Sequence, residues 1–249
     1  CEAKVDLTTA RLAAVGATGN ICSAYVREIS KVVPHLALIG RPQSRRRLER
    51  IAAQLCADAV QRIAAGDGSS GLGSVIRQTI AVRQFLASGE RPDGQALYHA
   101  IEQELGDASP IHIHEDFAAL RDCDVAVTAS NSAEPIIHAK DVGERLRVVC
   151  DISVPPDLAP DVLAERPDLL VLSGGMVRLP FEEDLELTEL GLPAGHLYAC
   201  MAETILLGFE NAAPQASTGD ITPEQVASMS ALASKHGFEL GYLVARKPF

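Results

Sequence analysis

The chain has no tryptophan, and aromatic residues make up only 4% of its 249 positions. It has no apolar run long enough to cross a bilayer, so no integral membrane segment is expected. Basic residues are outnumbered by acidic ones, 22 against 33, and the net charge of −11 argues against nucleic acid or an anionic membrane as a partner. No secretory signal precedes the first expected strand, which predicts a cytoplasmic protein.

The six cysteines form no Cys-x-x-Cys pair, so neither a disulfide framework nor a structural zinc site is expected. His112 and His114 alternate in an expected strand without a third ligand nearby, and we predict no metal. The sequence begins with Cys1 rather than methionine, which predicts a further N-terminal domain outside this chain.

Six short apolar runs predict strands, and stretches with helical spacing lie between them. Most of the runs are continuous rather than alternating, as in strands that are covered on both faces. They are "ARLAAVG", "HLALIGR", "PIHIHE", "DCDVAVTAS", "LRVVCDISVP" and "DLLVLSGG". This rhythm predicts an α/β protein with a doubly wound, parallel, Rossmann-type sheet.

The rhythm is interrupted between about residues 66 and 107. "DGSSGLGS" is expected to be a flexible linker, and two helical stretches follow it, so the region is interpreted as a helical insertion. After Pro193 the pattern becomes wholly helical. We therefore expect a Rossmann domain over residues 1–192 and C-terminal helices over 193–249 that pack on it.

The strongest local motif is "VGATGNICSA". Gly16 allows a sharp turn out of the first strand, and Gly19 allows backbone amides to approach a pyrophosphate at a helix N-terminus. A tight strand-to-helix turn without a ligand is the alternative. The residues expected to contact a dinucleotide at this turn are Gly16, Ala17, Thr18, Gly19, Asn20 and Ile21.

A basic cluster follows the second expected strand. Arg41 stands where NAD-preferring folds place an acid, and Ser44 and Arg45 follow it, so we interpret the cluster as the site of the 2′-phosphate of NADPH. A solvated helix face is the alternative for the later arginines. Residues at the ends of later strands should line the same groove: Ala129, Ser130, Asn131, Asp151, Ser173, Gly174 and Gly175.

Four stretches together carry a family resemblance: "VGATGNICSA", "LVLSGGMV", "LYACMAETILLGFE" and "ITPEQVASMSALASKHGF". The chain resembles the long-chain acyl-carrier-protein reductases of the cyanobacterial type. The resemblance implies NADPH-dependent reduction of a fatty acyl thioester to an aldehyde through an acyl-enzyme on Cys200. The chain departs from the family pattern in its helical insertion and in Cys22, which replaces a glycine.

Cys200 is expected about one turn into a helix that begins near Gly195, where the helix dipole favours a thiolate. His196 and Glu203 are spaced to share a helix face with it, so the three form the candidate catalytic set. An acyl carrier protein or a coenzyme A thioester is the expected partner, and a homo-oligomer is compatible with the sequence.

The reductase is the first of three possible functions, and two alternatives to it remain open. "TASNSAEPII" and "DISVPPD" resemble the NADPH domain of glutamyl-tRNA reductase, whose nucleophile lies in another domain, so Cys200 would then have no role. The second function is that of another NADP-dependent oxidoreductase, of this or the shikimate dehydrogenase type. The third is a non-catalytic nucleotide-binding domain.

Overall fold

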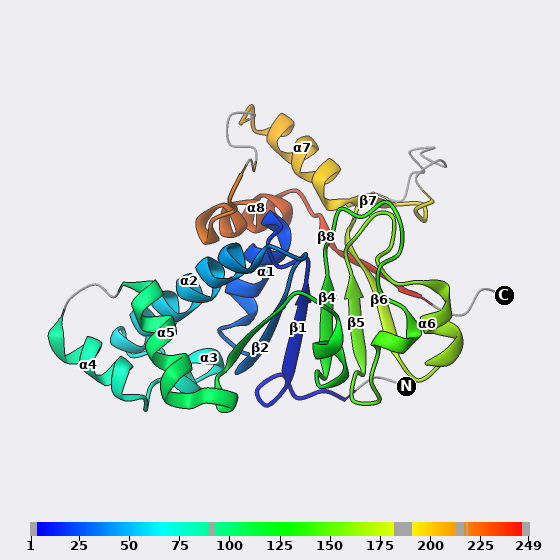
Figure 1. The fold of residues 1–249 in the computed structure, drawn as a ribbon. Helices are drawn as coiled ribbons and strands as arrows, with labels where there is room; N and C mark the ends of the chain where they lie inside the picture. Colours follow the sequence, from blue (N-terminus) through cyan, green and yellow to red (C-terminus); the bar gives the residue numbers. More distant parts are fainter. Residues whose placement is uncertain (1–3, 90–92, 182–190, 213–216, 218, 246–249) are drawn as a thin grey trace. The chain divides into compact units, whose positions relative to one another are not determined.

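The computed structural model describes residues 4–89, 93–181, 191–212, 217 and 219–245. These residues form two compact units, the first ending at Leu170 and the second beginning at Val171. Eight strands and eight α-helices occur in these ranges, which confirms the α/β class (Figure 1). None of the helices in these ranges is long and apolar enough to span a membrane.

The first unit contains five parallel strands in the order β3-β2-β1-β4-β5. The chain moves outward from β1 to β3 and then returns to the other side of β1, which confirms the Rossmann-type winding. Ligands of such sheets bind at the carboxyl ends of the strands where the winding reverses, here β1 and β4. The strands are β1 Arg11–Val15, β2 His35–Ile39, β3 Ile111–His114, β4 Val125–Thr128 and β5 Val148–Asp151.

Helices α2 to α5 lie together on one side of β1 and β2 (Figure 1). Three of them, α3 to α5, stand between α2 and β3, where the sequence predicts the helical insertion. The helices of this unit are α1 Asn20–Ile29, α2 Arg45–Ala64, α3 Gly71–Ile76, α4 Ile80–Ser88, α5 Gly94–Leu105 and α6 Pro160–Glu165. Short 3-10 turns are η1 Gly106–Ala108, η2 Ala118–Arg121 and η3 Ala139–Asp141.

One hydrophobic cluster joins the strands to these helices. Leu12 of β1 and Leu36 and Leu38 of β2 are buried in it with Leu55 of α2 and Leu97 of α5. Each such leucine contributes about 1.5–3 kcal/mol by leaving water. This burial holds β1 and β2 rigid, and the two strands position the glycine turn described below.

The prediction that "DGSSGLGS" is a flexible linker is wrong, because this segment packs against the end of α1. Its second half forms the start of α3, and Gly71 is buried. The Leu72 amide donates to the Ser30 carbonyl at 2.8 Å, and the Ser70 hydroxyl donates to the Lys31 carbonyl at 2.8 Å. The glycines therefore allow close backbone contact rather than flexibility.

The second unit is built around an antiparallel strand, β6 Leu170–Arg178, which pairs with both β7 His196–Tyr198 and β8 Glu239–Ala245. Its helices are α7 Ala199–Phe209 and α8 Pro223–Lys235. The prediction of a wholly helical segment after Pro193 is therefore wrong. Because β6 pairs with strands from that segment, the units divide at residue 170 rather than at the expected 192.

The sequence predicted Ser173, Gly174 and Gly175 at the end of a strand, and this prediction is wrong. They lie inside β6, where the register with β8 shifts between Ser173 and Met176. Gly175 has a φ of +72°, which a glycine adopts without strain. These residues shape an irregularity in the strand of the second unit.

Candidate functional site

The glycine turn leaves β1 at the point where the sheet winding reverses. Gly16 has a φ of +77°, and a Cβ at this position would stand 2.7 Å from the Ala129 carbonyl oxygen. The Gly16 and Ala17 amides donate to the Ile39 carbonyl at 3.0 and 3.1 Å. The backbone thus passes so close to the loop after β4 that only glycine fits, and Ala17 is buried beneath it.

Helix α1 begins directly after this turn, with Gly19 at its N-cap. No side chain caps the helix in the described structure, and its first turn contains no acidic residue. The amides of Asn20, Ile21 and Cys22 therefore keep the unpaired hydrogens of a helix start, and the helix dipole places partial positive charge there. Such a start is suited to a phosphate.

Apolar and polar side chains frame this helix start. Ile21 is 56% exposed, which leaves apolar surface beside the free amides. Thr18 is half-buried in the turn, and Asn20 is exposed. The turn therefore offers an anion site with a hydrophobic edge.

Arg41 bridges the loops that follow β2 and β4. Its guanidinium donates to the Asn131 side-chain oxygen, although the two residues are 90 positions apart. The bridge joins the strand ends on either side of β1. Arg41 and Asn131 are both exposed, so they border the glycine turn on its solvent side.

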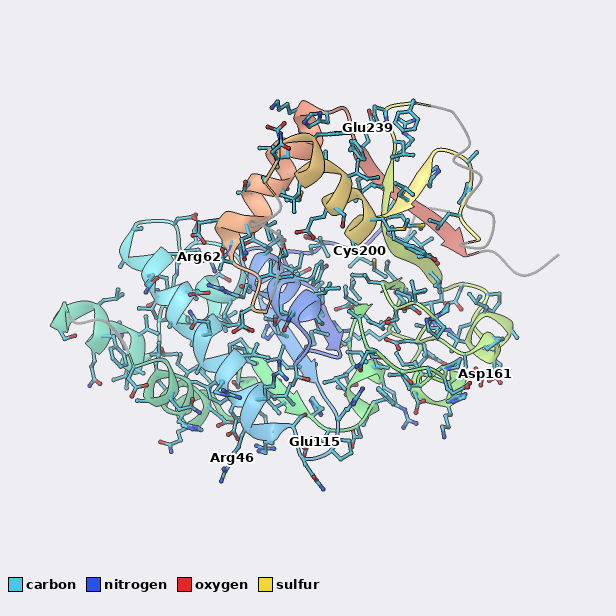
Figure 2. The ribbon with its side chains drawn as sticks, turned by 90° about the horizontal axis from the view of Figure 1, so that it is seen from above. Arg46, Arg62, Glu115, Asp161, Cys200 and Glu239 are labelled. Atoms are coloured by element: carbon cyan, nitrogen blue, oxygen red, sulfur yellow. The ribbon has the colours of Figure 1, made fainter. Side chains whose placement is uncertain are left out.

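The rest of the basic cluster is engaged locally. The Ser44 hydroxyl donates to the Arg41 carbonyl at 2.6 Å, and Arg45 pairs with Glu49 one helical turn later at 3.1 Å. Arg46 is exposed on α2 (Figure 2). Ser44 and Arg45 therefore support the start of α2, and Arg41 is the cation of this cluster that reaches the loop after β4.

Asp151, expected to line the ligand groove, is buried and organises the backbone instead. One carboxylate oxygen accepts from the Thr128 hydroxyl at 2.8 Å and the Ser153 amide at 3.0 Å. The other accepts from the Asp157 amide at 2.8 Å and the Leu158 amide at 3.1 Å. Burial raises the pKa of Asp151 above its usual value, and the nearby Asp157 adds to the rise. Asp151 is therefore not free for a ligand.

A second buried acid, Asp157, escaped the sequence interpretation. It accepts from the Ser153 hydroxyl at 2.6 Å, from the Ser130 amide at 3.1 Å and from the Ser130 hydroxyl. Ser130, in the loop after β4, is thus held by Asp157, whereas the sequence expected it to face a cofactor. The signal was present in "DISVPPD", which places two acids six residues apart around a proline turn.

The predicted catalytic residues all lie in the second unit. Cys200 is exposed at the second position of α7 (Figure 2), whereas His196 lies in β7 before that helix begins. The shared helix face expected for His196 and Cys200 does not form. Glu203 accepts from the Ser217 amide at 2.9 Å, and the His196 ring lies 3.1 Å from the Ala194 carbonyl. Both side chains are thus engaged with nearby backbone.

The remaining cysteines in the described ranges include three buried ones, Cys22, Cys56 and Cys123, and half-buried Cys150. Burial raises the pKa of Cys22 and of Cys56 to about 12, which makes both thiols unreactive. Cys1 lies outside the described residues. Among the residues that the structure describes, no group of three potential ligands is placed to hold a metal.

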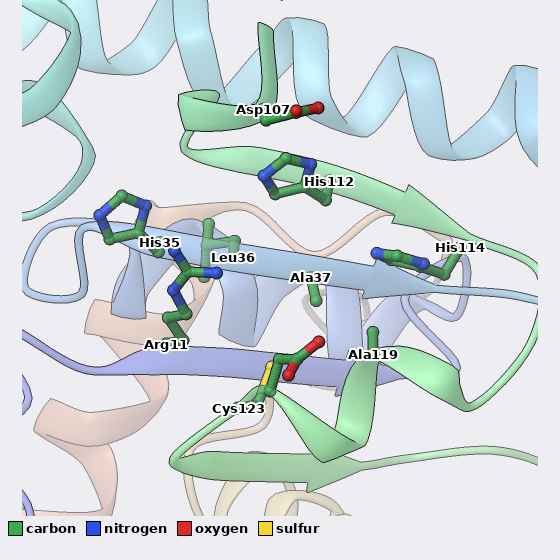
Figure 3. A pocket seen from close by; sticks show the side chains of 10 residues that line it. Arg11, His35, Leu36, Ala37, Asp107, His112, His114, Ala119 and Cys123 are labelled. Atoms are coloured by element: carbon green, nitrogen blue, oxygen red, sulfur yellow. The ribbon is translucent and has the colours of Figure 1, made fainter. Parts of the chain in front are cut away.

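A hollow lies on the face of the sheet opposite α2 and α5. Leu36 and Leu38 join the cluster with α2 and α5, so alternation turns His35 and Ala37 to the opposite face. There they line a cavity of about 220 Å³ with residues of β3, including His112 (Figure 3).

The histidines of this hollow predict a pH-dependent stability. Burial lowers the pKa of His35 below its ordinary 6.5, and Arg11 and His112 lower it further. Burial and His112 lower the pKa of His114, while Asp116 and Asp122 oppose the shift.

Because the unfolded chain takes up these protons more readily, the stability that both neutral rings contribute is present above pH 6.5 and is lost as pH falls through their lowered pKa values. We expect the urea midpoint to fall between pH 7 and pH 5. The double variant His35→Gln/His114→Gln should show a shallower fall. Equal slopes for both proteins would show that these rings do not titrate with folding.

Comparison with known proteins relates this chain to part of a longer protein. No protein-family model matches the chain. It is 34% identical over 166 residues to a protein named Aminotransferase PigE from Serratia sp. (strain ATCC 39006), a match that covers 66% of this chain and 19% of the relative. The chain therefore spans about a fifth of the length of that relative.

This relative overturns the predicted function. An aminotransferase points to a transferase, so the prediction of an NADPH-dependent reductase that converts acyl thioesters to aldehydes is wrong. The prediction of NADPH as the cofactor is wrong for the same reason.

Proposed function

We propose that this chain is a binding domain associated with a transferase, and that its glycine turn holds the phosphate group of an organic phosphate ester. The observation that carries the proposal is the start of α1. Gly16 has the backbone conformation and the close contact that only glycine allows, and Gly19 leaves the first helical amides uncapped. Both features lie at the reversal of the winding, where ligands of open α/β sheets bind.

The relative supports the transferase part of the proposal. It is named an aminotransferase, and aminotransferases in general use pyridoxal phosphate, which is itself a phosphate ester. Four-fifths of that relative lies beyond the match, so its name does not assign the transfer chemistry to the matched segment.

Covalent pyridoxal phosphate chemistry does not fit the residues around the turn. That cofactor is held by a lysine amine as a Schiff base. In the described part of the first unit, Lys31 pairs with Glu28 near the far end of α1. Lys140 lies in η3, between β4 and β5, and its backbone carbonyl accepts from Arg121, which stands before the start of β4. Lys4 precedes β1. None of them lies at the carboxyl ends of the strands, so we assign the turn a binding role and no covalent step.

The turn can bind and orient a ligand with groups of this chain alone. The amides of Asn20 and Ile21 would donate to phosphate oxygens, and the exposed Ile21 side chain would cover an apolar part of the ligand. Arg41, held by Asn131, would add a positive charge at the rim. Charge-assisted hydrogen bonds of this kind contribute about 1.5–3 kcal/mol each.

A matched pair of substitutions at Gly19 tests this proposal. Gly19→Asp places a good N-cap at α1 but also a negative charge where the phosphate would lie. Gly19→Asn adds a neutral side chain of the same shape, and the φ of −78° suits both. The Asp variant should bind phosphate esters about tenfold more weakly than the Asn variant, since their difference is one charge close to the ligand.

The ligands are also chosen as pairs that differ only in phosphate. Calorimetric titration would compare ADP with adenosine, and 4′-deoxypyridoxine 5′-phosphate with 4′-deoxypyridoxine, which cannot form a Schiff base. The phosphorylated member of at least one pair should bind more tightly. Equal binding within both pairs, or no difference between Gly19→Asp and Gly19→Asn, would refute a phosphate site at this turn.

A further inference from the structure

Three arginines on α2 form an exposed cluster without a partner in the chain. Arg46, Arg47 and Arg50 are exposed, and none of them makes an ion pair among the described residues. Glu49, the nearby acid on the same helix, already pairs with Arg45 at 3.1 Å. Nowhere else in the described ranges do three unpaired cations lie within five residues. We call these three residues the arginine face.

The stability of the fold does not explain the arginine face. Arg46 and Arg47 lie in the first turn of α2, where no acidic residue is present and the helix dipole disfavours positive charge. Arg46 and Arg50 are about one helical turn apart, so their like charges repel each other. Charges that weaken their own helix and pair with nothing else in the described chain are explained better by a partner.

The spacing of the arginine face indicates which anion fits it. Successive helical residues are about 100° apart, so Arg46 and Arg47 spread over a surface rather than converge on one phosphate group. From Arg46 to Arg50 the helix rises only about 6 Å. Figure 2 shows Arg46 at one end of α2, with Arg62 towards the other. This surface suits a few separate carboxylates, and it is too short for a nucleic acid, which the net charge of −11 also repels.

We propose that the arginine face binds an acidic segment of another protein, in which aspartate or glutamate side chains stand one helical turn apart. Such carboxylates repeat at about 6 Å along a helix, the same interval as Arg46 and Arg50. Each guanidinium presents a planar fork of donors that matches one carboxylate. The surface is separate from the glycine turn and requires no ligand there.

Two peptides that differ only in charge test this proposal. One is a short fluorescein-labelled peptide of alanine and glutamate, with glutamates one helical turn apart, and the other has glutamine in place of every glutamate. Fluorescence anisotropy with the full chain, at about 0.15 M salt, should show binding of the glutamate peptide alone. Its affinity should fall as salt is raised, because exposed charges are screened.

A matched pair of double variants locates the binding. Arg46→Gln/Arg50→Gln should weaken the glutamate peptide about tenfold, since two exposed ion pairs are lost. Arg77→Gln/Arg83→Gln removes two exposed arginines that have no ion pair in the described chain, one after α3 and one in α4, and should change nothing. The melting temperature of Arg46→Gln/Arg50→Gln should equal or exceed that of the wild type, because a repulsion is removed.

Other outcomes would overturn the proposal. Equal binding of the two peptides, or equal losses in the two double variants, would exclude an acidic partner at this face. Weaker ADP binding by Arg46→Gln/Arg50→Gln, with unchanged peptide binding, would assign the arginines to the phosphate site. Sedimentation of the wild type as a dimer and of this variant as a monomer would make a second copy the occupant. Gly19→Asp should leave peptide binding intact, so a failure of the phosphate site is distinguished from a failure of this surface.

Discussion

Asp151→Asn is expected to lower the free energy of unfolding by about 1–6 kcal/mol, because one or two buried amide donors would lose their acceptor at about 1–3 kcal/mol each. The carboxylate accepts two hydrogen bonds on each oxygen, from Thr128 and Ser153 on one side and from the Asp157 and Leu158 amides on the other. Whichever way an asparagine amide turns, its NH₂ group faces at least one backbone amide, which has no other acceptor in this cluster; the Thr128 hydroxyl can rotate and accept from it.

Urea denaturation at pH 7 would measure this loss. Asp67→Asn is the control, since Asp67 is exposed at the end of α2 and its amide substitution should change stability by less than about 0.5 kcal/mol. If Asp151→Asn were as stable as the control, Asp151 would not hold the turn after β5, and its expected role as a ligand residue would be open again.

Gly71→Ala is expected to cost about 2–5 kcal/mol of stability, of which 1–2 arise from backbone strain and the rest from overpacking. Gly71 has a φ of +56°, and a Cβ there would stand 2.2 Å from the Ser30 carbonyl oxygen and 2.6 Å from that of Lys31. Both contacts are with backbone atoms, so neither can be relieved by a side-chain rotation.

Gly89→Ala separates the two contributions. Gly89 also has a positive φ, +69°, but no atom lies within 4 Å of the position of its Cβ. This control should lose only the strain, about 1–2 kcal/mol. Equal losses at the two positions, measured by urea denaturation, would mean that α3 does not press against the end of α1.

The strands of the first unit could be predicted from the sequence because continuous apolar runs have few alternatives in a chain of this class. The turn at Gly16 could be predicted because its glycine spacing follows a strand and opens a helix. The contact of Gly71 could not, since glycines that permit close packing look the same in sequence as glycines of a flexible linker. β7 has only three residues, too few to show a strand pattern.

The sequence predicted where in the fold the candidate site lies, but not which of the polar residues there are free to face a ligand. A polar residue at the end of a parallel strand has the same sequence pattern whether it faces a ligand or its own backbone. Asp151 does the latter, because a cluster of backbone amides after β5 needs an acceptor. The function was wrongly predicted because it rested on the resemblance of four short stretches to one family, and the glycine turn among them does not specify a ligand or a reaction.

Backbone amide NMR during a titration with ADP and with 4′-deoxypyridoxine 5′-phosphate tests the central claim most directly. We predict that at least one of the two shifts the amide signals of Gly19, Asn20, Ile21 and Cys22, that its unphosphorylated partner does not, and that Gly19→Asp suppresses the shifts. If those four signals stay unmoved while amides elsewhere in the chain respond to the phosphorylated ligands, the start of α1 is not the phosphate site.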